Sequence, residues 1–167
     1  MRGYLLDTNI LKYWFDENCL EHQKVFDRIT SLEPGTPLRI SAISLGEMEY
    51  GHCCVTDEDT TIQLKFKQFI NTRLPEVLKI QRSTSIYYGQ IRARLFKQFT
   101  PKNSRKNLRP CQLIDPVTAI ELGIQENDLW IASQAIEYNL VLVTHDKMNR
   151  IKEVAGDLLN FEDWAVY

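Results

Sequence analysis

Two aspartates follow apolar stretches that are typical of buried strands. Asp7 comes directly after Tyr4–Leu6, and Asp146 follows Leu140–Val143 with Thr144 and His145 in between. Open α/β folds place their sites at the carboxyl ends of parallel strands. If the two stretches are neighbouring strands, both carboxylates stand at one rim of the sheet, with the Thr144 hydroxyl as a supporting group.

Glu47 lies in a segment, residues 41–51, where a strand end passes into a helix. Two interpretations are open. Ser44 and Glu47 match the spacing of a capping box, in which the acid only satisfies a backbone N–H and contributes about 1 kcal/mol to helix stability. Alternatively, the Glu47 carboxylate faces Asp7 across the sheet and belongs to the same site.

Asp128 falls in the first turn of a predicted helix, for which Asn127 is a good N-cap. It lies on the same helix face as Ile131 and Ala132, which form an apolar stripe. An acid on a solvent-facing side would merely favour the helix dipole. An acid on a buried stripe needs a compensating group, and a cation is the usual one.

These four acids predict a site for a divalent cation. Carboxylates a few ångströms apart raise each other's pKa, and a bound Mg²⁺ or Mn²⁺ offsets that repulsion. Such an ion can activate water for attack on a phosphodiester, and we expect RNA as the substrate. Asp7 and Asp128 are the expected direct ligands, whereas Glu47 and Asp146 bind through water, orient the nucleophile or complete a second ion site.

The composition describes an ordinary globular protein. The chain has 167 residues, 44% of them hydrophobic and 25% charged, which fits one domain over residues 1–167. Its apolar stretches are too interrupted to span a membrane, and Asp7 interrupts the place of a secretory signal, so we expect a cytoplasmic protein. The four cysteines contain no Cys-x-x-Cys pair, which favours reduced thiols.

The net charge of −2 hides a basic segment between Glu76 and Asp115. That segment contains nine basic residues and no acid, so the rest of the chain has eleven basic and twenty-two acidic residues. We expect an exposed, basic insertion around residues 100–110. It is either a solvated loop or an arm that contacts phosphates. The candidate RNA contacts are Arg92, Lys102, Arg105, Lys106 and Arg109.

The elements that must position these groups alternate between strands and helices. This alternation predicts an α/β fold, a three-layer sandwich around a central parallel sheet of four to five strands. Strands are expected at 4–6, 38–40, 77–80 and 140–143, with a short fifth at 160–161 and Trp164 in a packed tail. Helices are expected at 10–15, 20–32, 62–74, about 83–99 and 115–122, and after Ser44 and Asn127.

Four short motifs resemble those of PIN domains, and within that superfamily those of VapC-type toxins. They are Leu6-Asp7-Thr8-Asn9, the segment 41–51 around Glu47, the run from Asn127 to Ala132, and Val143-Thr144-His145-Asp146. The order and approximate spacing hold over nearly the whole chain. The basic insertion is longer than expected for a compact toxin.

The resemblance implies a PIN-like sandwich with endoribonuclease activity and a Mg²⁺ or Mn²⁺ site. By position, Asp7, Glu47, Asp128 and Asp146 match the family's acidic quartet, with Thr144 and Asn9 in support. It also implies a homodimer that is neutralised by a small antitoxin.

Other classes of protein place an acid after a first strand. A phosphatase that forms a phospho-aspartate generally needs a second acid two residues on, where this chain has Asn9. A signalling receiver domain needs its acceptor aspartate after the third strand, where this chain reads Ile80-Gln81-Arg82. A non-toxin PIN nuclease in RNA processing and a non-catalytic RNA-binding or partner-binding PIN module remain alternatives.

Overall fold

The computed structural model of the chain describes residues 2–55, 60–74, 76–100 and 108–166. Its strands form one parallel sheet in the order β3-β2-β1-β4-β5. The strands are β1 (Tyr4–Leu6), β2 (Leu38–Ser41), β3 (Val77–Leu78), β4 (Val141–Val143) and β5 (Asn160–Glu162). The predicted α/β fold with a parallel sheet is therefore confirmed.

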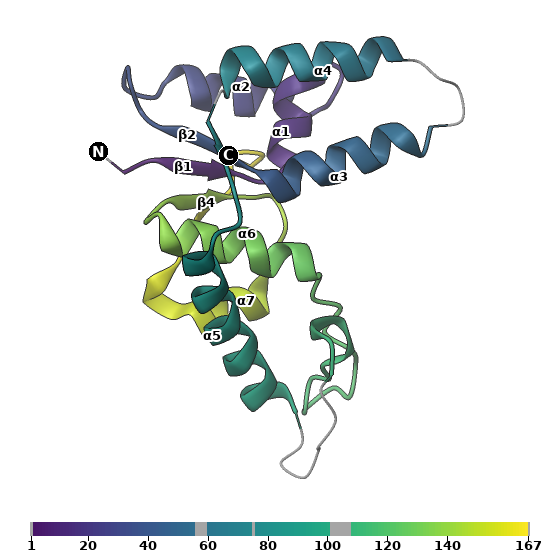
Figure 1. The fold of residues 1–167 in the computed structure, drawn as a ribbon, viewed down its shortest axis with the longest axis vertical. Helices are drawn as coiled ribbons and strands as arrows, with labels where there is room; N and C mark the ends of the chain where they lie inside the picture. The colour runs from purple at the N-terminus through teal and green to yellow at the C-terminus, as the bar shows by residue number, and fades with distance from the viewer. Residues whose placement is uncertain (1, 56–59, 75, 101–107, 167) are drawn as a thin grey trace.

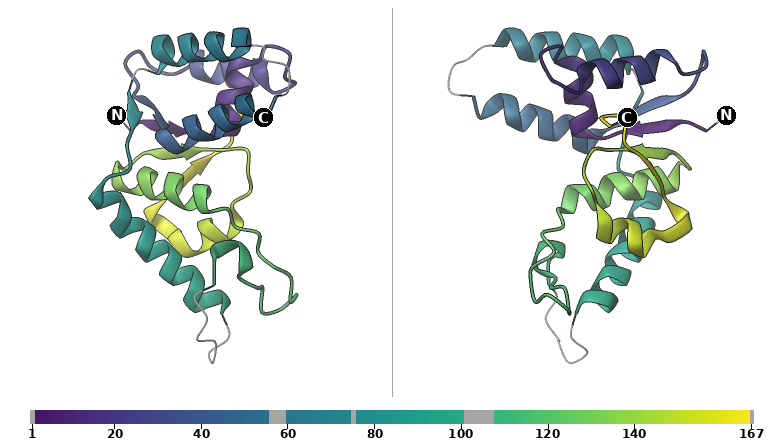
Figure 2. Two further views of the ribbon diagram at one scale, coloured as in Figure 1. Left: turned by 45° about the vertical axis from the view of Figure 1, so that its right-hand side comes forward. Right: turned by 180° about the vertical axis from the view of Figure 1, so that it is seen from behind.

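Helices cover both faces of this sheet (Figure 1). On one side lie α1 (Thr8–Phe15), α2 (His22–Thr30), α3 (Ala42–Cys53) and α4 (Thr60–Arg73). On the other side lie α5 (Arg82–Phe99), α6 (Glu126–Glu137) and α7 (Asn149–Ala155). The two further views in Figure 2 show the same three layers, with the sheet between the helical groups. Short 3-10 turns occur at Pro110–Gln112 and Gly156–Leu158.

Each layer buries its own apolar cluster. Leu6, Ile10 and Leu11 anchor the cluster beneath α1, α2 and α4. Leu142 and Leu129 belong to the cluster beneath α5, α6 and α7. The strands are apolar on both faces because both faces are covered, as expected for a parallel sheet. Trp164, from the predicted tail, is 3% exposed and packs edge-on against Tyr4, which confirms the packed tail.

The register of β1 and β4 brings the carboxyl ends of the two strands level with each other, at the candidate site. Leu6 lies opposite Val143, and the Asp7 N–H donates to the Val143 carbonyl at 2.9 Å. Both strands therefore end at the same level, with Asp7 and Thr144 as the next residues. The prediction that the two acid-terminated strands are neighbours is confirmed.

The predicted helix at 115–122 is wrong. The Asp115 carboxylate accepts the backbone N–H groups of Val117 and Thr118 at 2.8 and 3.1 Å, and Ala119 has a φ of 59°. These features produce a tight turn, and Ile114 pairs with Glu121 across it in an antiparallel bridge. Proline at the second position of the segment starts the turn instead of a helix.

Two segments of the chain differ from the elements expected from the sequence or lie outside the described residues. Helix α7, only seven residues long, follows β4 and was not anticipated. Residues 101–107, the centre of the predicted basic insertion and the location of Lys102, Arg105 and Lys106, lie outside the described residues. Within the described ranges, no helix is long and apolar enough to cross a bilayer.

Candidate active site

Asp7 is held at the carboxyl end of β1 by hydroxyl and backbone donors. The Thr144 hydroxyl donates to Asp7 Oδ2 at 2.7 Å, and the Thr8 N–H donates to Oδ1 at 2.7 Å. The second of these bonds caps the start of α1, so one carboxylate both begins the helix and faces the sheet edge. Asp7 is only 3% exposed. It is a buried acid whose described partners are neutral hydrogen-bond donors.

The Asn9 side chain connects the ends of β1 and β4. Its Nδ2 group lies 3.0 Å from Asp146 Oδ2 and 3.3 Å from Asp7 Oδ2. Its Oδ1 accepts the N–H of His145 at 3.2 Å. Asp146 and Asp7 thus share one amide donor, which places both acids at the same edge. Asn9 and Thr144 both contact Asp7, and their supporting role stays a prediction.

Glu47 projects from the second turn of α3 and does not serve as a helix cap. Helix α3 begins at Ala42, and the Ser41 hydroxyl caps it by accepting the Ile43 N–H at 2.9 Å. The capping-box interpretation of Ser44 and Glu47 is therefore wrong, because Ser44 lies inside the helix. Glu47 is free to face the neighbouring elements.

Two donors hold the Glu47 carboxylate. Asn127 Nδ2 donates to Oε1 at 2.7 Å, and the Thr8 hydroxyl donates to Oε2. These donors come from the starts of α6 and α1, so Glu47 is fixed between the two helical layers. Asn127 is not the N-cap that the sequence predicted, since α6 begins at Glu126 with Gln125 before it.

Asp128 lies in the first turn of α6, at the edge of the apolar stripe formed by Ile131 and Ala132. Its pKa is raised from 3.8 to about 7, first by burial and then by the negative charges of Asp7, Asp146 and Glu47. A carboxyl group in this position holds its proton close to neutral pH. The expectation that Asp128 faces inward is confirmed.

The pKa of Asp7 is also raised, from 3.8 to about 6. Burial is the largest cause, and the charges of Asp146 and Glu47 add to it. Hydrogen bonds from Thr144 and Thr8 act in the opposite direction but do not cancel the effect. Shifts of this size, produced by burial together with charged neighbours, are characteristic of functional sites.

The four acids do not form a preorganised ion cage. In the described part of the chain, no three acidic, histidine or cysteine side chains are arranged to hold one metal ion. Instead, Asp146 turns toward Asn9, and Glu47 turns toward Asn127 and Thr8. Unneutralised carboxylates repel each other, so each is expected to turn to a neutral donor. Their role as metal ligands stays a prediction.

The chemistry of the side chains nevertheless fits a hard divalent cation. Carboxylate, hydroxyl and amide oxygens are the ligands that Mg²⁺ and Mn²⁺ prefer. No described basic side chain makes a hydrogen bond or ion pair with Asp7, Glu47, Asp128 or Asp146. The negative charge at this edge is thus left for a cation to neutralise.

The described basic candidates differ in their surroundings. Arg92, on α5, donates to the Tyr88 hydroxyl at 2.6 Å and pairs with Glu126 at 3.3 Å. Tyr88 in turn stacks on Trp130, with ring centroids 3.9 Å apart. Arg92 therefore belongs to a cluster that joins α5 to the start of α6. Its acidic partner, Glu126, is two residues before Asp128. Arg109 is exposed. RNA contact by either residue stays a prediction.

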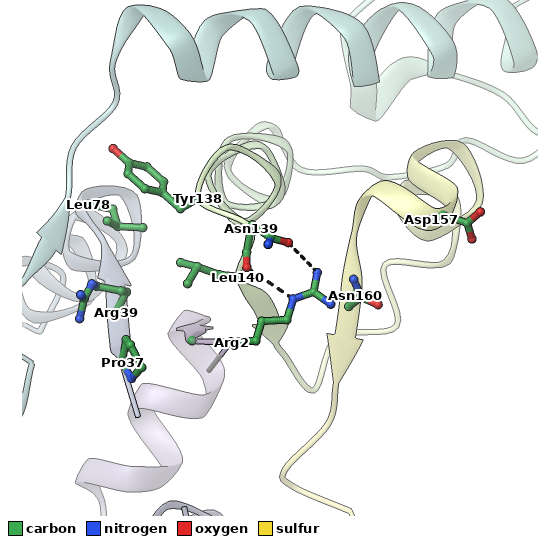
Figure 3. Close-up of a pocket in the computed structure, with 10 residues that line it drawn as sticks. Arg2, Pro37, Arg39, Leu78, Tyr138, Asn139, Leu140, Asp157 and Asn160 are labelled. Atoms are coloured by element: carbon green, nitrogen blue, oxygen red, sulfur yellow. Dashed lines mark hydrogen bonds between the residues drawn. The ribbon is translucent and has the colours of Figure 1, made fainter. Parts of the chain in front are cut away.

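A cavity of about 830 Å³ lies at the opposite, amino end of the sheet (Figure 3). Arg2 points into it and donates to Asn139 Oδ1 at 3.1 Å. The side-chain oxygen of Asn160, turned toward the guanidinium, accepts from Arg2 Nη1 at 2.8 Å. Arg39, also on this cavity, pairs with Glu76 at 2.7 Å. Arg39 is paired with an acid, and the exposed Arg2 is hydrogen-bonded to neutral amide groups, so neither resembles the buried Asp7 carboxylate.

Sequence reasoning missed Thr8 and Asn127 as the groups that orient Glu47. Each stands directly beside a predicted acid, Thr8 after Asp7 and Asn127 before Asp128. A hydroxyl or amide adjacent to a candidate ligand is the available signal. It was not decisive, because Asn127 also matched the preference for an N-cap.

Comparison with known proteins identifies the fold family. The family model of the PIN domain matches residues 4–157. Ribonuclease VapC2 of Rickettsia felis is 29% identical over 150 residues, covering 90% of this chain and 88% of that protein. Ribonuclease VapC1 of Haemophilus influenzae is 26% identical over 164 residues, covering 97% and 98%.

Solved structures agree with this assignment. The structure of VapBC2 from Rickettsia felis bound to a DNA fragment from its promoter superposes with a TM-score of 0.68 at 28% identity. It covers 96% of this chain and 98% of that chain. Since the family model spans nearly the full sequence, this chain belongs to the PIN domain family.

Proposed function

We propose that this chain is an endoribonuclease that hydrolyses RNA phosphodiester bonds with Mg²⁺ or Mn²⁺. The observation that carries the proposal is the gathering of four acids at the rim of a PIN-domain sheet, where Asn9 links Asp7 to Asp146, and burial and the charges of Asp7, Asp146 and Glu47 raise the pKa of Asp128 to about 7. Relatives that match over nearly the whole chain carry the name ribonuclease, which supports RNA as the substrate.

The four acids receive distinct roles in this proposal. Asp7 and Asp128 would bind the ion directly, because Asp7 is buried, Asp128 is half-buried, and neither has a described cationic partner. A bound divalent cation would stabilise the negative charge that develops on the phosphate and lower the pKa of the attacking water. Glu47 and Asp146 would orient that water or complete the ion site, starting from the positions where their amide and hydroxyl donors hold them.

Three neutral side chains orient Asp7, Asp146 and Glu47. Thr144 donates to Asp7, Asn9 lies between Asp7 and Asp146, and Asn127 fixes Glu47. Metal-site partners of this kind set the orientation of ligands and typically contribute 10- to 100-fold to affinity or activity. We expect them to remain in place when the ion binds.

We also propose that the chain is the toxin of a toxin–antitoxin pair and is neutralised by a small antitoxin protein. The support is its similarity to VapC ribonucleases and to the toxin chains of VapBC complexes. The same resemblance leads us to propose a homodimer. The four free cysteines fit a reducing compartment such as the cytoplasm.

The test of nuclease activity is incubation of the purified protein with total RNA in Mg²⁺, in Mn²⁺ and in EDTA. We expect cleavage with either ion and none with EDTA, and the ion alone should raise the melting temperature of the protein. RNA that stays intact in both ions, together with a melting temperature that neither ion changes, would reject the proposal in favour of a non-catalytic PIN module.

A separate experiment tests the toxin assignment. Expression of the chain should arrest growth, and co-expression of the product of an adjacent small gene should relieve the arrest. A chain that cleaves RNA without arresting growth would instead be a nuclease of RNA processing.

A further inference from the structure

A second cavity, of about 460 Å³, opens directly from the acidic site. Asp128 and Asp146 line it at one end. Its two other walls are the 113–124 loop and the segment 147–151 at the start of α7. The volume lies within the range of about 300–1,000 Å³ that is typical of small-ligand sites. A ligand in this cavity would therefore lie next to a cation or phosphate bound by Asp128 and Asp146.

The 113–124 loop is held in a fixed shape. Its ends, Leu113 and Ile124, are 2% and 7% exposed and belong to the apolar core. Between them, the Asp115 carboxylate accepts two backbone N–H groups of the turn and pairs with Arg150 of α7. Arg150 also lies over the Phe99 ring, 5.1 Å from its centroid. The two walls of the cavity are therefore joined by an ion pair.

The lining of this cavity combines one available cation with apolar surface. Lys147, next to Asp146, makes no ion pair or hydrogen bond with any residue in the described ranges. Ile120 lines the loop side and is 67% exposed, and Met148 lines the opposite side. Of the acids that line the cavity, Asp115 is paired with Arg150. Glu121, Asp128 and Asp146 make no ion pair with Arg150.

We propose that this cavity is the subsite for the nucleotide beside the scissile phosphate. Lys147 would contact the sugar–phosphate chain, and the base would pack between Ile120 and Met148, where Thr118 offers a polar contact. Single-stranded RNA carries negatively charged phosphates and apolar base faces. The phosphates match the lysine, and a base face matches the apolar side chains beside the proposed cleavage site. The inference rests on the proposed function, because the acids repel a phosphate unless a cation neutralises them.

The binding experiment uses the full chain carrying Asp7→Asn, so that RNA is bound but not cut. The affinity for a labelled single-stranded RNA is measured in Mg²⁺ at several salt concentrations. Lys147→Ala should weaken binding several-fold and reduce the slope of log affinity against log salt by about 0.7, the value for one phosphate contact on a single strand. Lys65→Ala, an exposed lysine on α4, is the matched control and should change neither quantity.

The specificity experiment maps cleavage positions in RNA for the otherwise unchanged protein. Ile120→Ala should relax the nucleotide preference at one position next to the cut, whereas Ile86→Ala, on α5 and 58% exposed, should leave the pattern unchanged. Both side chains are exposed, so neither variant should unfold, and melting curves check this.

The outcomes separate the two proposals. If the unsubstituted protein cleaves RNA but Lys147→Ala and Ile120→Ala behave like their controls, the subsite is rejected and the proposed function stands. If these variants lose affinity for the antitoxin and keep RNA binding, the cavity is a protein-binding surface and the subsite is again rejected. If no RNA is cleaved under any condition, both proposals fail.

Discussion

The two ends of the parallel sheet differ in how deeply their charged groups are buried. At the carboxyl end, burial and neighbouring negative charges raise the pKa values of Asp7 and Asp128. At the amino end, Arg2 donates to Asn139 and Asn160. The cavity at the amino end is nevertheless the larger one, about 830 Å³ against about 460 Å³ beside the acids. Buried acids with raised pKa values, and not cavity size, therefore mark the end where chemistry is expected.

The sharpest test of this comparison is substitution of Asp7 and of Asp128, the two acids whose pKa values are raised. Asp7→Asn or Asp128→Asn should reduce the rate of RNA cleavage by more than about 100-fold, which exceeds the usual loss from removing a residue that only orients a ligand. A single-turnover cleavage assay at saturating Mn²⁺ measures this effect. Full activity in both variants would reject the site assignment.

Asp157→Asn provides the control at the amino end, because Asp157 lines the larger cavity. We expect this variant to cleave RNA at the parental rate. Equal losses from substitutions at both ends would show that the variants act through the fold and not through the site.

The second prediction concerns the pH dependence of stability without metal. Between pH 4 and 7 the folded protein retains protons on Asp7 and Asp128 that the unfolded chain has released, because both folded pKa values are raised. The free energy of unfolding contributed by these groups therefore falls as the pH rises through about 6 and 7, and the loss is complete above pH 7.

Removing one of the crowded charges should reverse this loss. In EDTA at pH 8, Asp128→Asn should stabilise the protein by on the order of 2 kcal/mol, or roughly 5 °C in melting temperature. The gain should vanish below pH 4, where the parental carboxyl is protonated. Thermal melts of the parent and variant across pH 4–8 measure the difference, and a gain that does not depend on pH would contradict the electrostatic explanation.

A smaller effect is expected from the amide that holds Glu47. Asn127→Ala removes the donor at 2.7 Å and should lower the affinity for Mn²⁺ or the cleavage rate by about 10-fold. Asn139→Ala, which removes an amide at the amino end, is its counterpart. Titration of activity with Mn²⁺ distinguishes the two, and identical curves for both variants would show that the Glu47 contact has no role in ion binding.

The smallest effect is expected at Arg2. Arg2→Ala removes exposed hydrogen bonds to Asn139 and Asn160, so it should cost at most about 1 kcal/mol of stability and leave RNA cleavage unchanged. Denaturant unfolding and the RNA assay measure the two quantities. A marked loss of cleavage would show that the amino end also contributes to function.

The positions of Asp7 and Asp146 could be predicted from the sequence because strand ends are a local signal. Asp7 directly follows an apolar run and Asp146 follows one after two residues, and parallel strands bring such ends to one edge. The inward orientation of Asp128 also followed from its place relative to Ile131 and Ala132. The role of Glu47 was ambiguous, because the Ser44 spacing fits a cap equally well until the true start of α3 is known.

Other features depend on contacts that local patterns do not encode. The turn at 115–122 forms because the Asp115 carboxylate competes with helical hydrogen bonds and because Arg150, thirty-five positions later, pairs with it. Helix α7 is too short to give a clear apolar period. The contact between Asn127 and Glu47 joins residues 80 positions apart, so it emerges only when α3 and α6 pack.

That last contact has a consequence for how activity arises during synthesis of the chain. The donors to Glu47 come from opposite sides of the sheet, Thr8 from the layer completed early and Asn127 from the layer completed late. A nascent chain that has assembled only its first half holds this carboxylate by a single bond. Asp128, on α6, and Asp146, after β4, also belong to the second half of the chain, so the acidic edge is complete only after both elements have been synthesised and packed.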